Sequence, residues 1–316
     1  MALDRFEFLE FGDQPAPQST AQSESTDTDA SMDWELKGVE VIGEYGTAAG
    51  QFNYPAGIST DIAGNLYVAD RFNHRVQRIT AGGQVLVFGP QGPVNVPFEE
   101  PVAVAVSPSG EIICVAEARN GIIHCFYSSG QLIKRLTGFH NPKALALADN
   151  QILWVTDPAA GRLIQMNVQT GTVFRVLGRE SGLSAPCALA TGAQDVLLCS
   201  DTYTNQIFQI IQNGMNVRVA ALNTRPLNSP GGLAITSSGM LVVVETEDAE
   251  VLVLDRNGLG LAIYQGKPGQ TNSLSKPIAA APASGDSVYV ADCVGHFVLR
   301  LQLTRARKTA EEIDNL

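Results

Sequence analysis

The chain has 316 residues, of which 45% are hydrophobic and 17% charged, and its formal net charge is −11. This composition supports a large folded core, and since no apolar run approaches 18 residues, the sequence excludes a membrane-spanning helix. The acidity lies at one end: residues 1–36 hold nine acids and one base, whereas residues 37–303 hold 20 acids and 17 bases. We therefore expect a nearly neutral body behind an acidic tail.

Residues 1–36 are predicted to form that tail. Residues 13–33 are rich in Pro, Ser, Thr, Gln and Asp and cannot bury enough surface to offset their chain entropy, so we expect disorder. Residues 3–11 read LDRFEFLEF, and Phe6, Phe8 and Phe11 indicate either a docking motif, for the body or for a partner, or a frayed terminus. Acids stand where a secretory signal would be basic and then apolar, so we expect a cytoplasmic protein.

From residue 37 onward, one unit recurs six times, and its plainest copy is PAGISTDIAGNLYVADRFNHRVQRI at 55–79. Each unit has a proline, a short apolar run, a turn, a second apolar run that ends in a carboxylate, a polar loop and a third run. The prolines are Pro55, Pro101, Pro142, Pro186, Pro230 and Pro277. The carboxylates are Asp70, Glu117, Asp157, Asp201, Glu245 and Asp292. A period in the forties with several short strands predicts an all-β protein, a six-bladed β-propeller.

Four antiparallel strands are expected in each blade, and in the first unit they fall at about 56–61, 65–69, 75–80 and 84–88. Outermost strands are recognised at 85–89, 131–136, 172–178, 216–221 and 261–266, which is five strands for six blades. The last unit ends with 297–303, while VEVIG at 39–43 matches the outer pattern. A strand at 38–44 is therefore predicted to complete the last blade and close the ring, which removes an exposed sheet edge.

The predicted domains are the tail at 1–36, the propeller at 37–303 and a charged C-terminal tail at 304–316. The innermost strands are rich in Ala and Gly, since six sheets that converge on an axis leave no room for large side chains. Five cysteines occur without a CxxC pair, and most lie in apolar runs, so we expect buried free thiols in a reducing compartment.

The unit GQFNYPAGISTDIAGNLYVADRFNHRVQRI, followed by GGQVLVFG, resembles the NHL repeat. The triplet Asn73-His74-Arg75 carries most of the resemblance, and the six units cover residues 38–303. The resemblance implies a six-bladed propeller. It implies no single function, because propellers of this family include enzymes, RNA-binding modules and protein-binding modules.

The six carboxylates invite two interpretations. They could form a cation site of hard oxygen ligands. The alternative, which we favour because the acid recurs in every blade, is structural: each acid accepts N–H groups of its own loop or pairs with a base there, as Asp70 could with Arg75 and Asp157 with Arg162. No metal site is predicted from them.

Two further clusters could bind ligands. His74, His140 and His296 are expected on one face and could ligate zinc, although hydrogen bonding within the loops is the favoured interpretation. The loop of the fifth unit, with Glu247 and Asp248 after Glu245, could hold calcium or a basic partner, but a solvated loop is favoured.

Enzyme comparisons within the family count against catalysis. The family's amidating lyase is expected to carry a Pro-His pair at inner strands, but the residues after the six prolines are Ala56, Val102, Lys143, Cys187, Gly231 and Ile278. The calcium-dependent lactonase propellers place Glu, Asn and Asp in the channel, where the inner strands here offer only Asp61. We predict no catalytic residues and no cofactor. Nucleic acid is disfavoured because acids offset the bases in the loops.

We therefore predict a non-catalytic, monomeric propeller that binds a protein partner. The binding surface is expected on the loops between second and third strands and on the loops that enter each blade. Its candidate residues are Arg71, His74, Arg75, Arg119, His140, Arg162, Tyr203, Glu247, Asp248 and His296. A metal-dependent lyase or hydrolase at the channel mouth is the first alternative function, and an RNA-binding propeller is the second.

Overall fold

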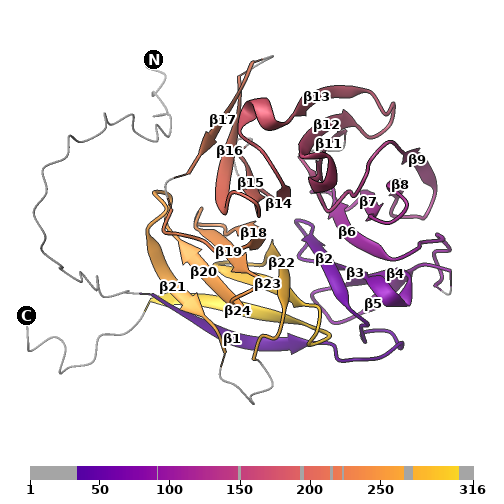
Figure 1. Cartoon of the computed structure of the whole chain (residues 1–316). Helices are drawn as coiled ribbons and strands as arrows, with labels where there is room; N and C mark the ends of the chain where they lie inside the picture. The colour runs from indigo at the N-terminus through magenta and orange to yellow at the C-terminus, as the bar shows by residue number, and fades with distance from the viewer. Residues whose placement is uncertain are drawn as a thin grey trace, which may run out of the picture.

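The computed structural model describes residues 34–305 apart from residues 91, 149–150, 193–195, 214–215, 223 and 267–272. Six four-stranded antiparallel sheets surround a common axis (Figure 1), so the chain is the six-bladed propeller that the sequence predicts. The tail motif with Phe6, Phe8 and Phe11 and most of the C-terminal tail lie outside the described residues. In the described part, no helix is long and apolar enough to span a membrane.

Within each blade, the strands run in sequence order from the axis outward, with one exception in blade 6. Blade 1 contains β2 (Pro55–Thr60), β3 (Leu66–Asp70), β4 (Arg75–Ile79) and β5 (Val85–Phe88). Blade 2 contains β6 (Pro101–Val106), β7 (Ile112–Glu117), β8 (Ile122–Tyr127) and β9 (Leu132–Leu136). Blade 3 contains β10 (Ala144–Leu147), β11 (Ile152–Asp157), β12 (Arg162–Asn167) and β13 (Val173–Leu177).

The second half of the ring repeats this plan. Blade 4 contains β14 (Pro186–Thr191), β15 (Leu197–Asp201), β16 (Gln206–Asn213) and β17 (Asn216–Ala221). Blade 5 contains β18 (Pro230–Ile235), β19 (Leu241–Glu245), β20 (Glu250–Leu254) and β21 (Gly260–Tyr264). Blade 6 contains β22 (Pro277–Pro282), β23 (Ser287–Asp292), β24 (Phe297–Arg305) and, from the other end of the chain, β1 (Trp34–Ile42). Three single-turn 3-10 helices lie in loops: η1 (Arg71–Asn73), η2 (Pro158–Ala160) and η3 (Arg179–Ser181).

Small residues line the axis because neighbouring inner strands nearly touch. A Cβ atom added to Gly57 of β2 would lie 2.6 Å from the Cα atom of Ala103 in blade 2. A Cβ atom on Gly232 of β18 would lie 2.8 Å from the Cα atom of Ala279 in blade 6. The crowding expected from the Ala- and Gly-rich inner runs is therefore present at these positions.

The hydrophobic core is divided into six clusters, and each cluster lies between two neighbouring blades. Between blades 6 and 1, for example, Phe52, Ile58 and Val68 pack against Ala291 and Val298. A blade therefore buries its apolar faces only against its neighbours, and the first and last blades must meet for either to be stable.

The ring is closed by β1, the indigo strand that lies beside the yellow β24 in Figure 1. The two strands are antiparallel, with Trp34 paired to Arg305 and Ile42 to Val298. Closure by an N-terminal strand agrees with the prediction, but the strand begins at residue 34 rather than 38. Its first residues extend into the segment assigned to the tail because β24 also continues past the predicted end of the propeller, to Arg305.

Truncation tests the closure. Removing residues 1–33 keeps all of β1, so we expect a nearly unchanged melting temperature. Removing residues 1–42 leaves the edge of β24 unpaired and uncovers the cluster around Leu36, so we expect aggregation and a melting temperature lower by roughly 10 °C or more. Scanning fluorimetry with light scattering measures both effects, and equal melting temperatures for the two truncations would contradict closure by β1.

Candidate functional site

The two faces of the ring differ in their loops. One face carries the loops that enter each blade and those that join its second and third strands, and we call it the carboxylate face because the six recurrent acids end the second strands there. The opposite face carries the turns that join first to second and third to fourth strands. In five blades the acid is the cross-strand partner of the blade's proline, as Asp70 is of Pro55.

All six carboxylates are buried, with side chains and backbone 0–3% exposed. Each accepts the backbone N–H of the residue two positions before its blade's proline. The N···O distance is 2.7 Å from Asn53 to Asp70, 2.8 Å from Glu99 to Glu117 and 2.7 Å from Ser184 to Asp201. The same bond joins His140 to Asp157, Asn228 to Glu245 and Ser275 to Asp292. A buried carboxylate is costly unless it is hydrogen-bonded, so each acid and the loop that enters its blade stabilise one another.

The residue directly before the proline takes one of two arrangements. In blades 3, 4 and 6 it also donates to the blade's own carboxylate, from Asn141 (2.8 Å), Ala185 (2.7 Å) and Lys276 (3.0 Å). In blades 1, 2 and 5 this residue has a left-handed backbone, with φ of 63° at Tyr54, 51° at Glu100 and 55° at Ser229. Its N–H then points away from the carboxylate and toward the preceding blade.

In those three cases the acceptor is a side chain four residues after the preceding blade's carboxylate. His296 Nδ1 accepts from Tyr54 (3.0 Å) and His74 Nδ1 accepts from Glu100 (3.3 Å). Asn205 Oδ1 accepts from Ser229 (2.9 Å). The left-handed turn costs about 1–2 kcal/mol, and the bond across the seam offsets part of that cost. We call these three bonds the seam bonds.

The other three seams have no such side chain. The equivalent residues are Gly121, Gly161 and Ala249, which share the left-handed backbone of His74, Asn205 and His296. A Cβ atom on Gly121 would lie 2.2 Å from the carbonyl oxygen of Phe139, because the loop that enters blade 3 packs directly against this glycine. The residue at this position therefore decides how each blade meets the next.

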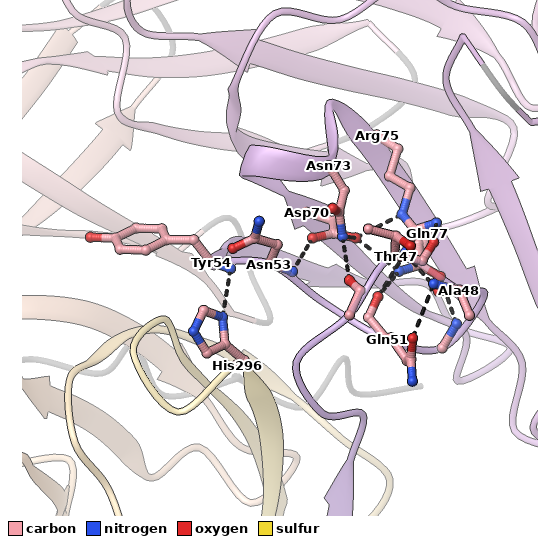
Figure 2. A network of polar contacts seen from close by, with 12 residues as sticks. Thr47, Ala48, Gln51, Asn53, Tyr54, Asp70, Asn73, Arg75, Gln77 and His296 are labelled. Atoms are coloured by element: carbon pink, nitrogen blue, oxygen red, sulfur yellow. Dashed lines mark hydrogen bonds and ion pairs between the residues drawn. The ribbon is translucent and has the colours of Figure 1, made fainter.

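Figure 2 shows this arrangement in blade 1, where the carboxylate has further partners. Asp70 also accepts from Arg75 (2.7 Å) and Gln77 (3.1 Å), and the Arg75 guanidinium donates to three carbonyl groups of the loop at 47–51. Tyr54 and His296 meet beside it, at the seam with blade 6. The Arg75 side chain is thus held inside the loop rather than presented to a ligand.

Blade 2 replaces these partners with a histidine. His124, only 5% exposed, lies with its Nε2 atom 3.2 Å from Glu117 Oε1 and packs edge-on against Phe98. Burial would raise the pKa of Glu117, but the close contact with His124 and the hydrogen bonds from the Glu99 N–H and Asn120 outweigh it and hold the pKa below its usual value. Glu117 therefore stays ionised in a buried site.

The ten predicted binding residues all lie in loops or at strand ends of the carboxylate face, and several of them are held by neighbouring groups of the chain. Arg162 pairs with Asp157 (2.8 Å) much as Arg75 pairs with Asp70, and His74 and His296 form seam bonds. His140 is exposed, and its backbone N–H binds Asp157. Arg119 lies 3.3 Å from Glu100, and Asp248 accepts from the Asn228 side chain. Tyr203 is 80% exposed.

The remaining two, Arg71 and Glu247, line a pocket of about 500 Å³ at the mouth of the central channel on the carboxylate face. Tyr54, Lys143 and Lys276 also line it. Sequence reasoning did not single out Tyr54, whose place beside the channel follows from its left-handed turn. The sequence feature that could have indicated the turn at Tyr54 is the His or Asn four residues after the carboxylate of the preceding blade.

Within the described residues, no three His, Cys, Asp or Glu side chains are grouped so that they could hold a metal ion. Asp61, which directly follows β2, lies at the opposite mouth, where it accepts from the backbone N–H of Asn65 (2.9 Å) and from the Tyr67 hydroxyl (3.1 Å). All five cysteines are buried and carry free thiols.

Residues 52–79 match the NHL repeat model. The chain is 28% identical over 141 residues to the protein brain tumor of Drosophila melanogaster, which covers 43% of this chain and 14% of that protein. It is 31% identical over 93 residues to peptidyl-glycine alpha-amidating monooxygenase A of Xenopus laevis, covering 27% and 10%. It is 28% identical over 92 residues to NHL-repeat-containing protein 4 of Mus musculus, covering 29% and 63%. The chain thus spans less than two thirds of each relative.

Solved propellers share the fold at low sequence identity. A gluconolactonase from Xanthomonas campestris superposes with a TM-score of 0.63 at 18% identity, over 81% of this chain and 88% of that one. Virginiamycin B lyase from Staphylococcus aureus superposes with a TM-score of 0.59 at 16% identity, over 88% and 91%. At such identities the likeness concerns the fold alone.

Substituting a buried carboxylate tests its contribution to stability. Asp201→Ala leaves the N–H groups of Ser184, Ala185, Tyr203 and Thr204 without their acceptor. We expect a loss of about 1–3 kcal/mol in the free energy of unfolding, measured with urea. The control is Asp248→Ala, which removes an exposed acid of the same face that accepts one side-chain hydrogen bond. Equal losses of unfolding free energy in the two variants would show that the buried acid does not fasten its loop.

The seam bonds predict that substitutions of His296 lower the free energy of unfolding by different amounts. His296→Ala removes the acceptor of the Tyr54 N–H, and we expect a loss of about 1 kcal/mol. His296→Asn should retain most of the stability, because Asn accepts the same bond in blade 4 and tolerates the left-handed backbone. Urea denaturation ranks the variants, and an Asn variant no more stable than the Ala variant would contradict the seam bond.

The lowered pKa of Glu117 predicts that its contribution to folding stability depends on pH. Since its pKa is lower in the folded than in the unfolded chain, its ionised form contributes stability above the unfolded value of about 4.3, and this contribution is lost as the pH falls further. Glu117→Gln should therefore destabilise the protein by about 1–3 kcal/mol at pH 7 and by much less near pH 3.5. Denaturation at both pH values measures the difference, and a cost independent of pH would be the contradicting result.

Proposed function

We propose that this six-bladed β-propeller, in which residues 52–79 match the NHL repeat, is a non-catalytic module that binds a protein partner through its carboxylate face. The observation that carries the proposal is the set of large apolar and aromatic side chains exposed in the loops of that face. They are Tyr45 (67% exposed), Phe72 (43%), Tyr203 (80%) and Val294 (52%). Exposed aromatic and large apolar residues that share one face are the kind of surface that anchors protein partners.

These residues are carried on a rigid support. Phe72 belongs to η1, next to the loop that Asp70 holds, and Tyr203 follows Asp201, which accepts its N–H (3.1 Å). Val294 lies in the loop whose next residue, Gly295, donates to Asp292 (2.7 Å). The buried carboxylates therefore support the proposed binding loops, so that little ordering entropy is lost when a partner docks.

The proposal includes a monomeric protein in the cytoplasm, since five buried free thiols fit a reducing compartment. The first alternative function is a metal-dependent lyase or hydrolase at the channel mouth, which the similarity to an amidating monooxygenase supports. The second is an RNA-binding propeller. For the proposed module we expect EDTA to leave the melting temperature unchanged and metal analysis to find no stoichiometric ion. A large shift with EDTA would favour the enzyme.

The binding proposal is tested by comparing the two faces. Tyr203→Ser combined with Val294→Ser removes two exposed side chains from the carboxylate face. We expect partners recovered from an extract of the source cells to fall at least about tenfold, since interface aromatics contribute on the order of 1–2 kcal/mol or more. Quantitative mass spectrometry of the recovered proteins measures this.

The matched control is Ile62→Ser combined with Leu259→Ser, which removes two equally exposed apolar residues, 85% and 62%, from the opposite face. It should recover the same partners as the unaltered protein. Loss of partners in the control but not in the first variant would assign binding to the opposite face and overturn the proposal. The melting temperature of each variant verifies that the fold is retained.

A further inference from the structure

The two mouths of the central channel differ in charge. The mouth on the carboxylate face is lined by three cationic side chains, Arg71, Lys143 and Lys276, and by one acidic side chain, Glu247. The mouth on the opposite face, a pocket of about 260 Å³, is lined by Asp61 and by mostly apolar residues, with no cation among its lining side chains. The first mouth is thus cationic in a chain whose formal net charge is −11.

Two of these cations have no carboxylate partner. Arg71 is held by Glu100 at 2.9 Å. Lys143 and Lys276 are exposed, and neither forms a salt bridge with any described residue. They directly precede β10 and β22, the inner strands of blades 3 and 6. These blades are opposite one another in a six-bladed ring, so two ammonium groups without a salt bridge to a described residue face the same pocket from two sides.

Aliphatic side chains from four different blades line the inner part of this pocket, and the same four also line the pocket at the opposite mouth: Ile58, Leu145, Leu189 and Leu233. Tyr54 lies beside Arg71 at the rim of the cationic mouth, with the guanidinium 5.5 Å from the ring centroid. A ligand that matches both features must combine carboxylates with an apolar or aromatic side chain that reaches inward. A ligand that is only anionic would leave the aliphatic wall without a partner.

We propose that this mouth binds acidic–aromatic peptide segments and that residues 3–11 of this same chain, LDRFEFLEF, are its occupant. The segment interleaves Phe6, Phe8 and Phe11 with Asp4, Glu7 and Glu10, so that an aromatic ring can enter the aliphatic pocket while flanking carboxylates pair with Lys143 and Lys276. The proposal rests on the proposed binding of a protein partner by the carboxylate face and adds the chemistry of the ligand.

The chain is long enough for this contact within one molecule. Trp34, where the described chain begins, pairs with the end of β24, and it therefore lies on the opposite face at the rim of blade 6. Residues 12–33 can span about 70 Å when extended. The path is about 30 Å along the nine residues of β1 and about 25 Å from the rim to the axis of a body of this size.

The contact has a consequence for the proposed partner. A segment that is tethered to the propeller competes with any external peptide of similar chemistry, and a partner must displace it. Removing the three aromatic side chains therefore frees the mouth.

The experiment uses a fluorescein-labelled synthetic peptide of residues 1–14 and fluorescence anisotropy. The receptor is the full chain with Phe6, Phe8 and Phe11 replaced by Ala, whose own tail no longer competes. We expect saturable binding that weakens as salt is added, and binding at least threefold weaker to the unaltered full chain. Lys143→Glu combined with Lys276→Glu in the freed receptor should weaken binding at least tenfold.

Two controls locate the site. Arg135→Glu combined with Arg218→Glu reverses two charges on the outer strands β9 and β17 and should leave the affinity unchanged. Ile62→Glu adds a charge at the opposite mouth and should also leave it unchanged. Lys143→Gln combined with Lys276→Gln is a milder form of the mouth variant, and it should weaken binding in the same direction.

Three results with the peptide would overturn the proposal. They are the absence of peptide binding to the freed receptor, equal binding by the mouth variant and the outer-strand control, and loss of binding in the Ile62→Glu variant alone. A single-stranded RNA oligonucleotide that binds more tightly than the peptide and depends on the same lysines would also overturn the peptide as ligand. If the peptide fails while Tyr203→Ser with Val294→Ser still loses its partners, only this inference fails and the proposed function stands.

Discussion

Each blade depends on one buried carboxylate that accepts the N–H of the residue two positions before its proline. In five blades the proline starts the inner strand and the acid ends the second strand opposite it. In all six, the loop from the preceding blade donates to the acid. Because proline has no N–H, the residues before it supply the donors. The acid is only 0–3% exposed, so neither the carboxylate nor the loop can separate without leaving a buried group unpaired.

The same loops determine how the blades meet. Where the preceding blade offers His or Asn, as at His74, Asn205 and His296, the residue before the proline turns left-handed and donates across the seam. Elsewhere that residue donates to its own carboxylate. His296 lies at the seam between blades 6 and 1, where the ring closes, together with β1 and the cluster around Phe52. Closure therefore combines strand pairing, apolar packing and one hydrogen bond.

These constraints shape the carboxylate face. Four of the bases and histidines that look available in the sequence, namely Arg75, Arg162, His74 and His296, are used by the loops themselves. The groups left for a ligand include Lys143 and Lys276 at the mouth and the exposed apolar side chains of the same face. A fixed ring that presents a few unpaired groups is suited to recognition, since the supporting interactions are already satisfied before a ligand arrives.

The sequence by itself determined the six blades, the order of their strands and closure by an N-terminal strand, because proline, turn and carboxylate recur at a regular period and the last unit lacks an outer strand. It also located the six acids. It did not predict their main donors, which come from the loop 16–18 residues earlier, for example from Asn53 to Asp70 and from Glu99 to Glu117. Nor did it separate Arg75, held inside a loop, from Lys143, exposed at the channel mouth. Only the tertiary structure decides such pairings, since they depend on which blades and loops are brought into contact when the ring closes.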